Sequence, residues 1–321
     1  MTTPLEERFK QPVTGQHVTG LPASMHFIER DWLSSNQLLL FDAGGATLVD
    51  TGYGKHASLT VQLARHLLAR HGGAPLRRII NTHLHSDHCG GNAAMIAAFG
   101  CPVFVPAADA DYVARWDLDG LSFRATHQHC DRFSAAGSVA PGDTLTMGSA
   151  QWSALAAPGH DPHSLIFYCA EHRLLISADA LWENGFGVIF PELTGASGFA
   201  EQQAVLDLIA SLDVERVIPG HGAMFGDVGA AIERARSRLQ AFRADPSRNA
   251  RNALKALLTF QMLDHERMHI DELKAHAESA PVLADAARLI GQPLAQAVQA
   301  SIDDLVARSL LRRDGEWIYS A

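Results

Sequence analysis

The chain contains few cysteines and no long apolar run. Its four cysteines lie far apart and form no C-x-x-C pair, so the sequence indicates neither a disulfide framework nor a thiolate zinc site. Every apolar run is shorter than the roughly 20 residues that cross a bilayer. The N-terminus also lacks the apolar segment typical of a secretion signal. We therefore expect a soluble, cytoplasmic protein that makes no contact with membranes.

Positive charge is also scarce. Lys and Arg number 26 against 35 Asp and Glu, which gives a formal net charge of −9. Proteins that bind nucleic acid through its phosphates usually have the opposite balance, so nucleic acid is a disfavoured partner. A length of 321 residues with 47% hydrophobic residues predicts roughly two globular domains. Histidine is the abundant residue type, with 17 copies.

Short apolar segments alternate with helical patterns up to about residue 240. Strands are predicted at 37–42, 46–50, 76–82, 101–105, 151–157, 164–169, 173–178 and 214–218. Helices are predicted at 56–71, 91–100 and 200–212. This alternation predicts β-sheets covered by helices.

Beyond residue 240 the pattern becomes mainly helical. Helices are predicted at 250–264, 271–279, 282–290 and 293–310, followed by a hairpin that turns at Asp314-Gly315. This order resembles a winged helix, so we place two domains at 1–243 and 244–321. DNA binding by the second domain rests on fold analogy alone, because residues 245–321 hold nine Lys and Arg, eleven Asp and Glu, and no basic stripe. Packing on the first domain, covering its site or forming a homodimer is favoured instead.

The string THLHSDHCGG at 82–91 is the first sign of a metal site. In an extended segment His83 and His85 point to the same side, because strand side chains alternate. Once the chain turns, Asp87 and His88 can serve a second position. Imidazole and carboxylate ligands suit zinc, iron or manganese. Taken alone, the string could also be a polar loop with ordinary exposed histidines.

Three further candidate ligands make the polar-loop interpretation unfavourable. His160, Asp179 and His221 each follow an apolar strand, and two of them stand in a Pro-Gly-His context. If these strands run in one direction, all the candidate ligands meet at one edge of the fold. Five histidines and two aspartates are too many for one tetrahedral ion. They suit two ions that share a bridging carboxylate and a bridging water.

Together these motifs resemble the metallo-β-lactamase-fold hydrolase superfamily. HxHxDH at 83–88 is followed by PGH at 158–160, SAD at 177–179 and PGHG at 219–222, while LVDTG at 48–52 matches a further family feature. The resemblance covers about residues 13–240. It implies an α+β fold, a four-layer αβ/βα sandwich with metals at one edge, followed here by a small, mainly helical, winged-helix-like domain.

The resemblance also implies a role for each candidate ligand. The first metal would be held by His83, His85 and His160, and the second by Asp87, His88 and His221, with Asp179 bridging the two. Asp50 would not bind a metal itself but would fix the orientation of one of the ligands.

Comparison within the superfamily narrows the activity. True β-lactamases of this fold lack an aspartate that matches Asp179, so antibiotic hydrolysis is disfavoured. The pattern instead resembles glyoxalase II, lactonases, persulfide dioxygenases and the RNase Z group. Only 42 positions separate Asp179 from His221, which leaves no room for the large insert of the nucleolytic branch. His163 stands where these relatives often carry glycine, and it either touches substrate or is a hydrogen-bonded structural residue.

Residues 181–198 directly follow Asp179 and are irregular enough to form a substrate wall. Their aromatic residues Trp182, Phe186 and Phe190 either grip an acyl or alkyl group or pack the loop down. Elsewhere, His127 and His129 mimic the ligand spacing but lack the Asp-His continuation, so we interpret them as surface histidines. Cys89 is expected to be a small buried apolar residue rather than a ligand.

The leading hypothesis is a dinuclear metallohydrolase that acts on a small-molecule thioester, lactone or related ester. Its cofactors would be two divalent ions, zinc first, with iron or manganese as alternatives. A metal-bridging hydroxide would attack the carbonyl, and Asp87 is the candidate catalytic residue that orients it. An alternative is a mononuclear iron enzyme of the persulfide dioxygenase type that uses His83, His160 and Asp179. A third is a non-enzymatic nucleic-acid binder that acts through residues 244–321.

Overall fold

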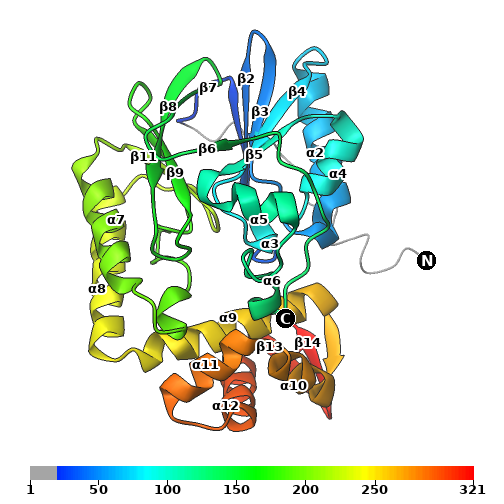
Figure 1. Cartoon of the computed structure of the whole chain (residues 1–321), viewed down its shortest axis with the longest axis vertical. Coiled ribbons are helices and arrows are strands. Elements are labelled where there is room, and N and C mark those ends of the chain that lie inside the picture. The colour runs from blue at the N-terminus through cyan, green and yellow to red at the C-terminus, as the bar shows by residue number, and fades with distance from the viewer. Residues whose placement is uncertain (1–19) are drawn as a thin grey trace.

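The computed structural model describes residues 20–321, so the first 19 residues of the predicted 1–243 domain lie outside the described residues. Two β-sheets face each other in the upper part of the molecule (Figure 1). The first contains, in spatial order, β1 (Met25–Ile28), β2 (Gln37–Asp42), β3 (Gly45–Val49), β4 (Leu76–Ile80), β5 (Val103–Pro106) and β6 (Gly137–Val139). The second contains β11 (Arg216–Pro219), β10 (Leu174–Ala178), β9 (Leu165–Cys169), β8 (Ala150–Ala156) and β7 (Thr144–Met147).

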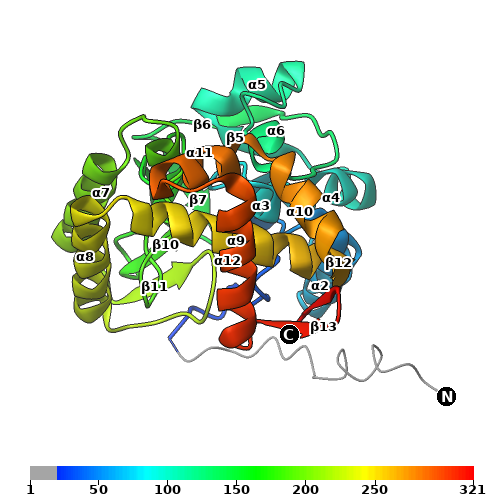
Figure 2. The ribbon, with the colours of Figure 1, turned by 90° about the horizontal axis from the view of Figure 1, so that it is seen from below.

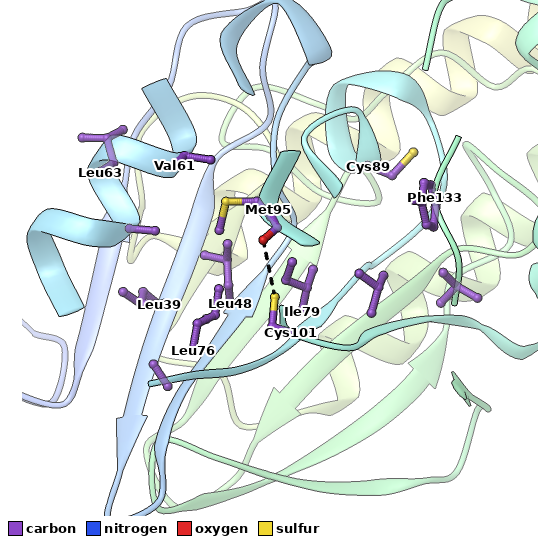
Figure 3. Packing of buried hydrophobic residues seen from close by; sticks show 14 of the residues in the cluster. Leu39, Leu48, Val61, Leu63, Leu76, Ile79, Cys89, Met95, Cys101 and Phe133 are labelled. Atoms are coloured by element: carbon purple, nitrogen blue, oxygen red, sulfur yellow. Dashed lines mark hydrogen bonds between the residues drawn. The ribbon is translucent and has the colours of Figure 1, made fainter. Parts of the chain in front are cut away.

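Helices cover the outer face of each sheet. The first sheet is covered by α2 (Ala57–Arg70), α4 (Asn92–Phe99) and α5 (Ala110–Arg115), and the second by α7 (Phe199–Ser211) and α8 (Val228–Ala244). Figure 3 shows Val61 of α2 and Met95 of α4 above Leu48 and Ile79 of the first sheet. The predicted α+β four-layer sandwich is therefore confirmed.

Strands β2, β9 and β10 are mostly apolar, and the side chains on both of their faces are buried. In β2, Leu39 packs under the helices, whereas Leu38 and Leu40 pack between the two sheets. Trp152 and Phe167 of the second sheet fill the same space between the sheets and are fully buried. Continuous apolar runs of this kind are typical of strands that are covered on both sides.

Strand direction brings the loops that follow several strands to one edge. In the first sheet β4 is parallel to both β3 and β5. In the second sheet β11 is parallel to β10, and β8 runs in the same direction because β9 is antiparallel to both β8 and β10. At this edge the Leu165 amide donates to the Thr82 carbonyl across the two sheets, at 2.8 Å. Loops after β3, β4, β8, β10 and β11 therefore converge.

The C-terminal region is mainly helical, as predicted. It contains α9 (Ser247–His265), α10 (Ile270–Glu278), α11 (Pro281–Ile290) and α12 (Leu294–Ala307). A three-stranded antiparallel sheet is formed by β12 (Arg267–His269), β14 (Trp317–Ser320) and β13 (Leu311–Asp314), with β14 in the middle. Seen from below, α9 crosses the base of the sandwich and α12 crosses α9 (Figure 2).

The loop after β10 joins this region to the sandwich. Val188 and Leu193 of that loop pack into the apolar core of the C-terminal helices. The side chain of Asn249 in α9 bonds both backbone groups of Ile189, accepting from the amide at 3.2 Å and donating to the carbonyl at 2.9 Å. No helix within residues 20–321 is both long and apolar enough to span a bilayer.

Candidate metal centre

The seven side chains with ligand spacing lie in the loops at this edge. His83 and His85 follow β4, and the short helix α3 (Ser86–Cys89) places Asp87 and His88 beside them. The remaining three residues follow strands of the second sheet, His160 after β8, Asp179 after β10 and His221 after β11. Two groups form, in each of which the potential ligand atoms lie within 4.8 Å of one another: His83, His85 and His160; and Asp87, His88, Asp179 and His221.

The first group brings three imidazole nitrogens together. Nδ1 of His85 lies 3.1 Å from Nε2 of His83 and 2.8 Å from Nε2 of His160. Burial lowers the pKa of His83 well below its usual value and that of His160 to about 4. His160 donates from Nδ1 to the Val188 carbonyl at 2.5 Å. Its Nε2 therefore keeps a free lone pair, which is the state in which histidine binds metals.

Asp179 lies between the two groups. Its Oδ2 is 3.4 Å from Nε2 of His160, and its Oδ1 is 3.4 Å from Nε2 of His88. Burial alone would raise the pKa of Asp179, but the charges of His88 and His221 outweigh burial and lower that pKa well below the usual value. The carboxylate is therefore ionised at neutral pH and faces both groups.

The rest of the second group surrounds the Asp87 carboxylate. Nε2 of His221 lies 3.0 Å from Oδ2 of Asp87. Burial disfavours charge on His88, but Asp179, Asp50 and Asp87 together raise its pKa well above the usual value. Nε2 of His88 is buried and makes no hydrogen bond to any described residue. A cation could bind between this unpartnered nitrogen and the carboxylate oxygens around it.

Asp50 holds His88 from the opposite side. Its carboxylate accepts from Nδ1 of His88 at 2.9 Å, from the Thr82 amide at 2.9 Å and from the Thr82 hydroxyl at 2.8 Å. Asp50 has a φ of 58°, a left-handed conformation that aspartate and asparagine tolerate better than most residues. The sharp bend after β3 thus turns this carboxylate towards the ligand loop.

Asp50→Asn is expected to lower metal affinity by about 10–100-fold. The substitution keeps a residue suited to the positive φ, but it replaces one acceptor oxygen with a donor that cannot accept from His88. Titration against a competing chelator measures the effect, with Asp42→Asn at the end of β2 as the control. Equal affinities of Asp50→Asn and the wild type would contradict the orienting role.

Glycines allow the ligand loops to approach one another closely. A Cβ atom at Gly220 would overlap Oδ1 of Asp179, and one at Gly187 would overlap the ring of His160. Gly220 directly precedes the candidate ligand His221, and Gly187 faces His160 from the loop after β10.

We expect Gly220→Ala to displace Asp179 and reduce turnover by roughly 10²-fold, because small displacements of reacting groups are costly. Far-ultraviolet circular dichroism should stay unchanged while bound metal falls. Gly229→Ala in α8 is the matched control, because a Cβ there meets nothing within 4 Å. If Gly220→Ala retained full metal content, the close packing at this edge would not be needed.

A cavity of about 410 Å³ opens from the candidate ligands towards α9. Trp182, Phe186 and Phe190 all line it, and the Phe190 ring centroid lies 5.3 Å from that of His85. The opposite wall is the face of α9, which contributes Leu257, Phe260 and Leu263. The cavity is therefore polar at the ligands and largely apolar farther out.

Two residues beside the ligands were not predicted. Trp32, in the loop before β2, is 59% exposed and stacks on His221 with 5.3 Å between ring centroids. Asp161 places Oδ2 3.6 Å from Nε2 of His85. A lone tryptophan in a polar loop gives no spacing signal, but Asp161 could have been noticed because it directly follows His160.

The structure places other singled-out residues away from the cavity lining. His163 donates from Nδ1 to Oδ1 of Asp109 at 2.6 Å, and this hydrogen bond raises the pKa of His163. It is not among the described residues that line the cavity. His127 forms a hydrogen bond with Ser279, and His129 forms one with Asp131. Cys89 is buried in the apolar core between the first sheet and its helices.

The fold and the two ligand groups define an αβ/βα sandwich with a candidate metal centre at one edge. A family model for the metallo-beta-lactamase superfamily matches residues 30–221. The chain belongs to this superfamily, which confirms the predicted family. Relatives named as a thioesterase and as a hydroxyacylglutathione hydrolase agree with the predicted enzyme class, a hydrolase.

Curated relatives match parts of the chain. The acyl-coenzyme A thioesterase MBLAC2 of Gallus gallus is 27% identical over 218 residues, which cover 62% of this chain and 77% of that protein. A hydroxyacylglutathione hydrolase of Rhodospirillum rubrum is 32% identical over 123 residues, which cover 38% of this chain and 41% of that protein. The second match therefore spans less than half of its relative.

Solved structures agree with the fold. The metallo-beta-lactamase family protein TTHA1429 from Thermus thermophilus aligns with a TM-score of 0.55 and 21% identity, covering 93% of this chain and 99% of that chain. TTHA1623 in a di-iron-bound form aligns with a TM-score of 0.51 and 26% identity, covering 65% of this chain and 98% of that chain.

Proposed function

We propose that this protein is a dinuclear metal-dependent hydrolase of a thioester, lactone or related ester. The placement of Asp179 carries the proposal, because its two oxygens each lie 3.4 Å from a histidine nitrogen of a different ligand group. The names of the chicken and Rhodospirillum rubrum relatives favour a thioester.

The donor set fits two divalent ions. Three lone-pair nitrogens gather in the first group, and the orphaned Nε2 of His88 faces carboxylates in the second. The first ion would be held by His83, His85 and His160; the second by Asp87, His88 and His221; and Asp179 would contact both. Histidine and aspartate ligands suit zinc, our first choice, and also iron or manganese.

The chain's own side chains prepare the site for hydrolysis. Bound divalent ions supply Lewis-acid chemistry, which lowers the pKa of water and polarises a carbonyl. Asp87, which is ionised and lines the cavity, accepts a hydrogen bond from the attacking water and orients it. Trp182 and Phe190 shield the reacting carbonyl from bulk water and contact its acyl group.

We further propose that residues 244–321 form a winged-helix-like domain that closes the cavity. The strand order β12-β14-β13 and the preceding helices support this assignment. Lys55 supports the closure, since it donates to the Leu263 carbonyl at 3.2 Å and pairs with Glu266 at 2.9 Å. The Tyr53 hydroxyl also donates to Asp264 at 2.8 Å. These contacts bind α9 over the cavity mouth, so the domain contributes a wall.

Hydrolysis and oxygenation are separated by a direct assay. A panel of acyl thioesters and lactones is expected to show metal-dependent release of thiol or acid near neutral pH, without oxygen uptake. A mononuclear dioxygenase that uses His83, His160 and Asp179 would leave the other three residues of the second group, Asp87, His88 and His221, without a role. Consumption of oxygen with glutathione persulfide, together with no hydrolysis of any ester, would overturn the proposal.

A further inference from the structure

A second groove, about 650 Å³ in volume, opens beside the metal cavity between α8, α9 and the end of α12. Six cationic side chains line it: Arg234, Arg238, Arg248, Arg251, Lys255 and Arg308. We call it the basic groove. None of the described residues that line it is Asp or Glu. In a chain with a net charge of −9, such a concentration of positive charge is unexpected.

The basic groove is continuous with the metal cavity. Arg238, Asn252, Lys255 and Arg308 line both. Figure 2 shows α12 crossing α9, with α8 beside the first turns of α9. A ligand that lies along α9 therefore passes from the candidate metal ligands over an apolar stretch to the cationic side chains.

Neighbouring carboxylates neutralise only part of this charge. Asp304 lies 3.0 Å from both Lys255 and Arg308, and Asp245 lies 3.7 Å from Arg248 and 3.9 Å from Arg251. Two carboxylates thus face six cations.

Arg238 has no carboxylate within ion-pair distance among the described residues. Its guanidinium lies 5.4 Å from the Phe186 ring centroid and 5.2 Å from that of Phe242. Its Nε is buried without a hydrogen-bond partner. Gly185, with a φ of 129°, makes room for it, since a Cβ there would meet the guanidinium at 3.1 Å. An anion bound beside Arg238 would offset the cost of burying this charge.

We infer that the basic groove binds the phosphate groups of a thioester whose thiol carrier ends in a phosphorylated nucleotide. The inference rests on the proposed hydrolase function and specifies its substrate class. The acyl end would lie in the apolar cavity, and the phosphates would bind the guanidinium forks. In the reaction the C–S bond breaks, a C–O bond to water forms, and the proton released by the water passes to the thiolate.

The surroundings of the groove favour a nucleotide carrier over a nucleic-acid strand. Residues 245–321 contain nine Lys and Arg and eleven Asp and Glu, so the positive charge does not extend along this region. The adjoining cavity presents Val188, Leu257 and Phe260, which suit an acyl chain and not a polyanion.

Two esters with the same acyl group test the inference. Hexanoyl-coenzyme A carries nucleotide phosphates, whereas hexanoyl-N-acetylcysteamine has the same C–S bond without them. The kcat/KM for hexanoyl-coenzyme A divided by that for hexanoyl-N-acetylcysteamine is the quantity to compare. The double variant Arg248→Gln/Arg251→Gln is expected to lower this ratio by about tenfold or more, because it removes charge-assisted hydrogen bonds to the phosphates. The change should lie in KM.

The matched control is Arg236→Gln on α8. Arg236 pairs with Asp207 and Glu233 and does not line the groove, so the ratio should stay at the wild-type value. Calorimetric titration with adenosine 3′,5′-bisphosphate should show salt-sensitive binding that the double variant weakens.

Failure of the inference and failure of the proposed function have different signatures. Hydrolysis of both esters with an unchanged ratio, and no binding of the bisphosphate, would overturn the groove assignment while leaving the hydrolase. Hydrolysis of neither ester would contradict the thioesterase activity on which the inference rests, and the binding titration would still decide whether the groove binds the bisphosphate. Tighter binding of a single-stranded oligonucleotide than of the bisphosphate would overturn the inference in favour of nucleic acid.

Discussion

Asp179→Ala is expected to lower kcat/KM by about 10³-fold or more, because several kcal/mol of transition-state stabilisation depend on the bound ions. The variant should also lose metal from both positions, since the two oxygens of Asp179 face different ligand groups. Steady-state kinetics and metal analysis of the same purified sample measure the two effects together.

A surface aspartate provides the control for this substitution. Asp213 is exposed and pairs with Arg173 at 2.7 Å, so Asp213→Ala should retain wild-type kinetics and metal content. An Asp179→Ala protein that kept both metals and full activity would show that this carboxylate does not bridge them.

Removal of metal by a chelator is expected to lower activity by about 10³-fold and also to destabilise the fold. A ligand that binds only the native state stabilises it by about 4 kcal/mol at 1,000 times its dissociation constant. Here the ions would offset the repulsion between the buried carboxylates of Asp87 and Asp179.

Urea unfolding with and without excess metal measures this stabilisation. Restoration of activity with zinc, iron or manganese in turn would rank the three metals. Full activity after exhaustive chelation, with the metal analysis at zero, would contradict a metal-dependent reaction.

The candidate ligands could be found from the sequence because each follows an apolar strand. Strand direction decides where such residues meet, and a parallel arrangement brings them to one edge. His83, His160 and Asp179 are far apart in sequence, and they could be placed together only on the condition that their strands run in one direction, with the resemblance to the superfamily supplying the ligand groups. The register of β3 with β4, where Val49 lies opposite Ile80, then aligned Asp50 with the ligand loop.

Other parts of the fold were not predicted. The strands β1, β6, β7 and β12 contain only three or four residues each, too few for a reliable period. Helix α8 was not predicted, although its buried residues Ile232, Ala235, Leu239 and Phe242 recur at helical spacing. Arginines stand between them, and the apolar residues pack under the second sheet.

The cavity walls depend on contacts between distant segments. Trp32 stacks on His221 although 189 positions separate them. Arg238 and Arg308 line the same groove because α8 and α12 both pack against α9. The sequence count of charges beyond residue 244 concealed the basic groove, because the acidic residues lie mostly elsewhere on the helices. Local composition does not report how charge is divided between faces.

The proposed function requires the two ligand groups to hold two divalent ions. Inductively coupled plasma mass spectrometry of the purified protein, calibrated against protein concentration from amino-acid analysis, tests it most directly. We expect about two ions of zinc, iron or manganese per chain. A single iron per chain, with the second group empty even after incubation with excess metal, would contradict it.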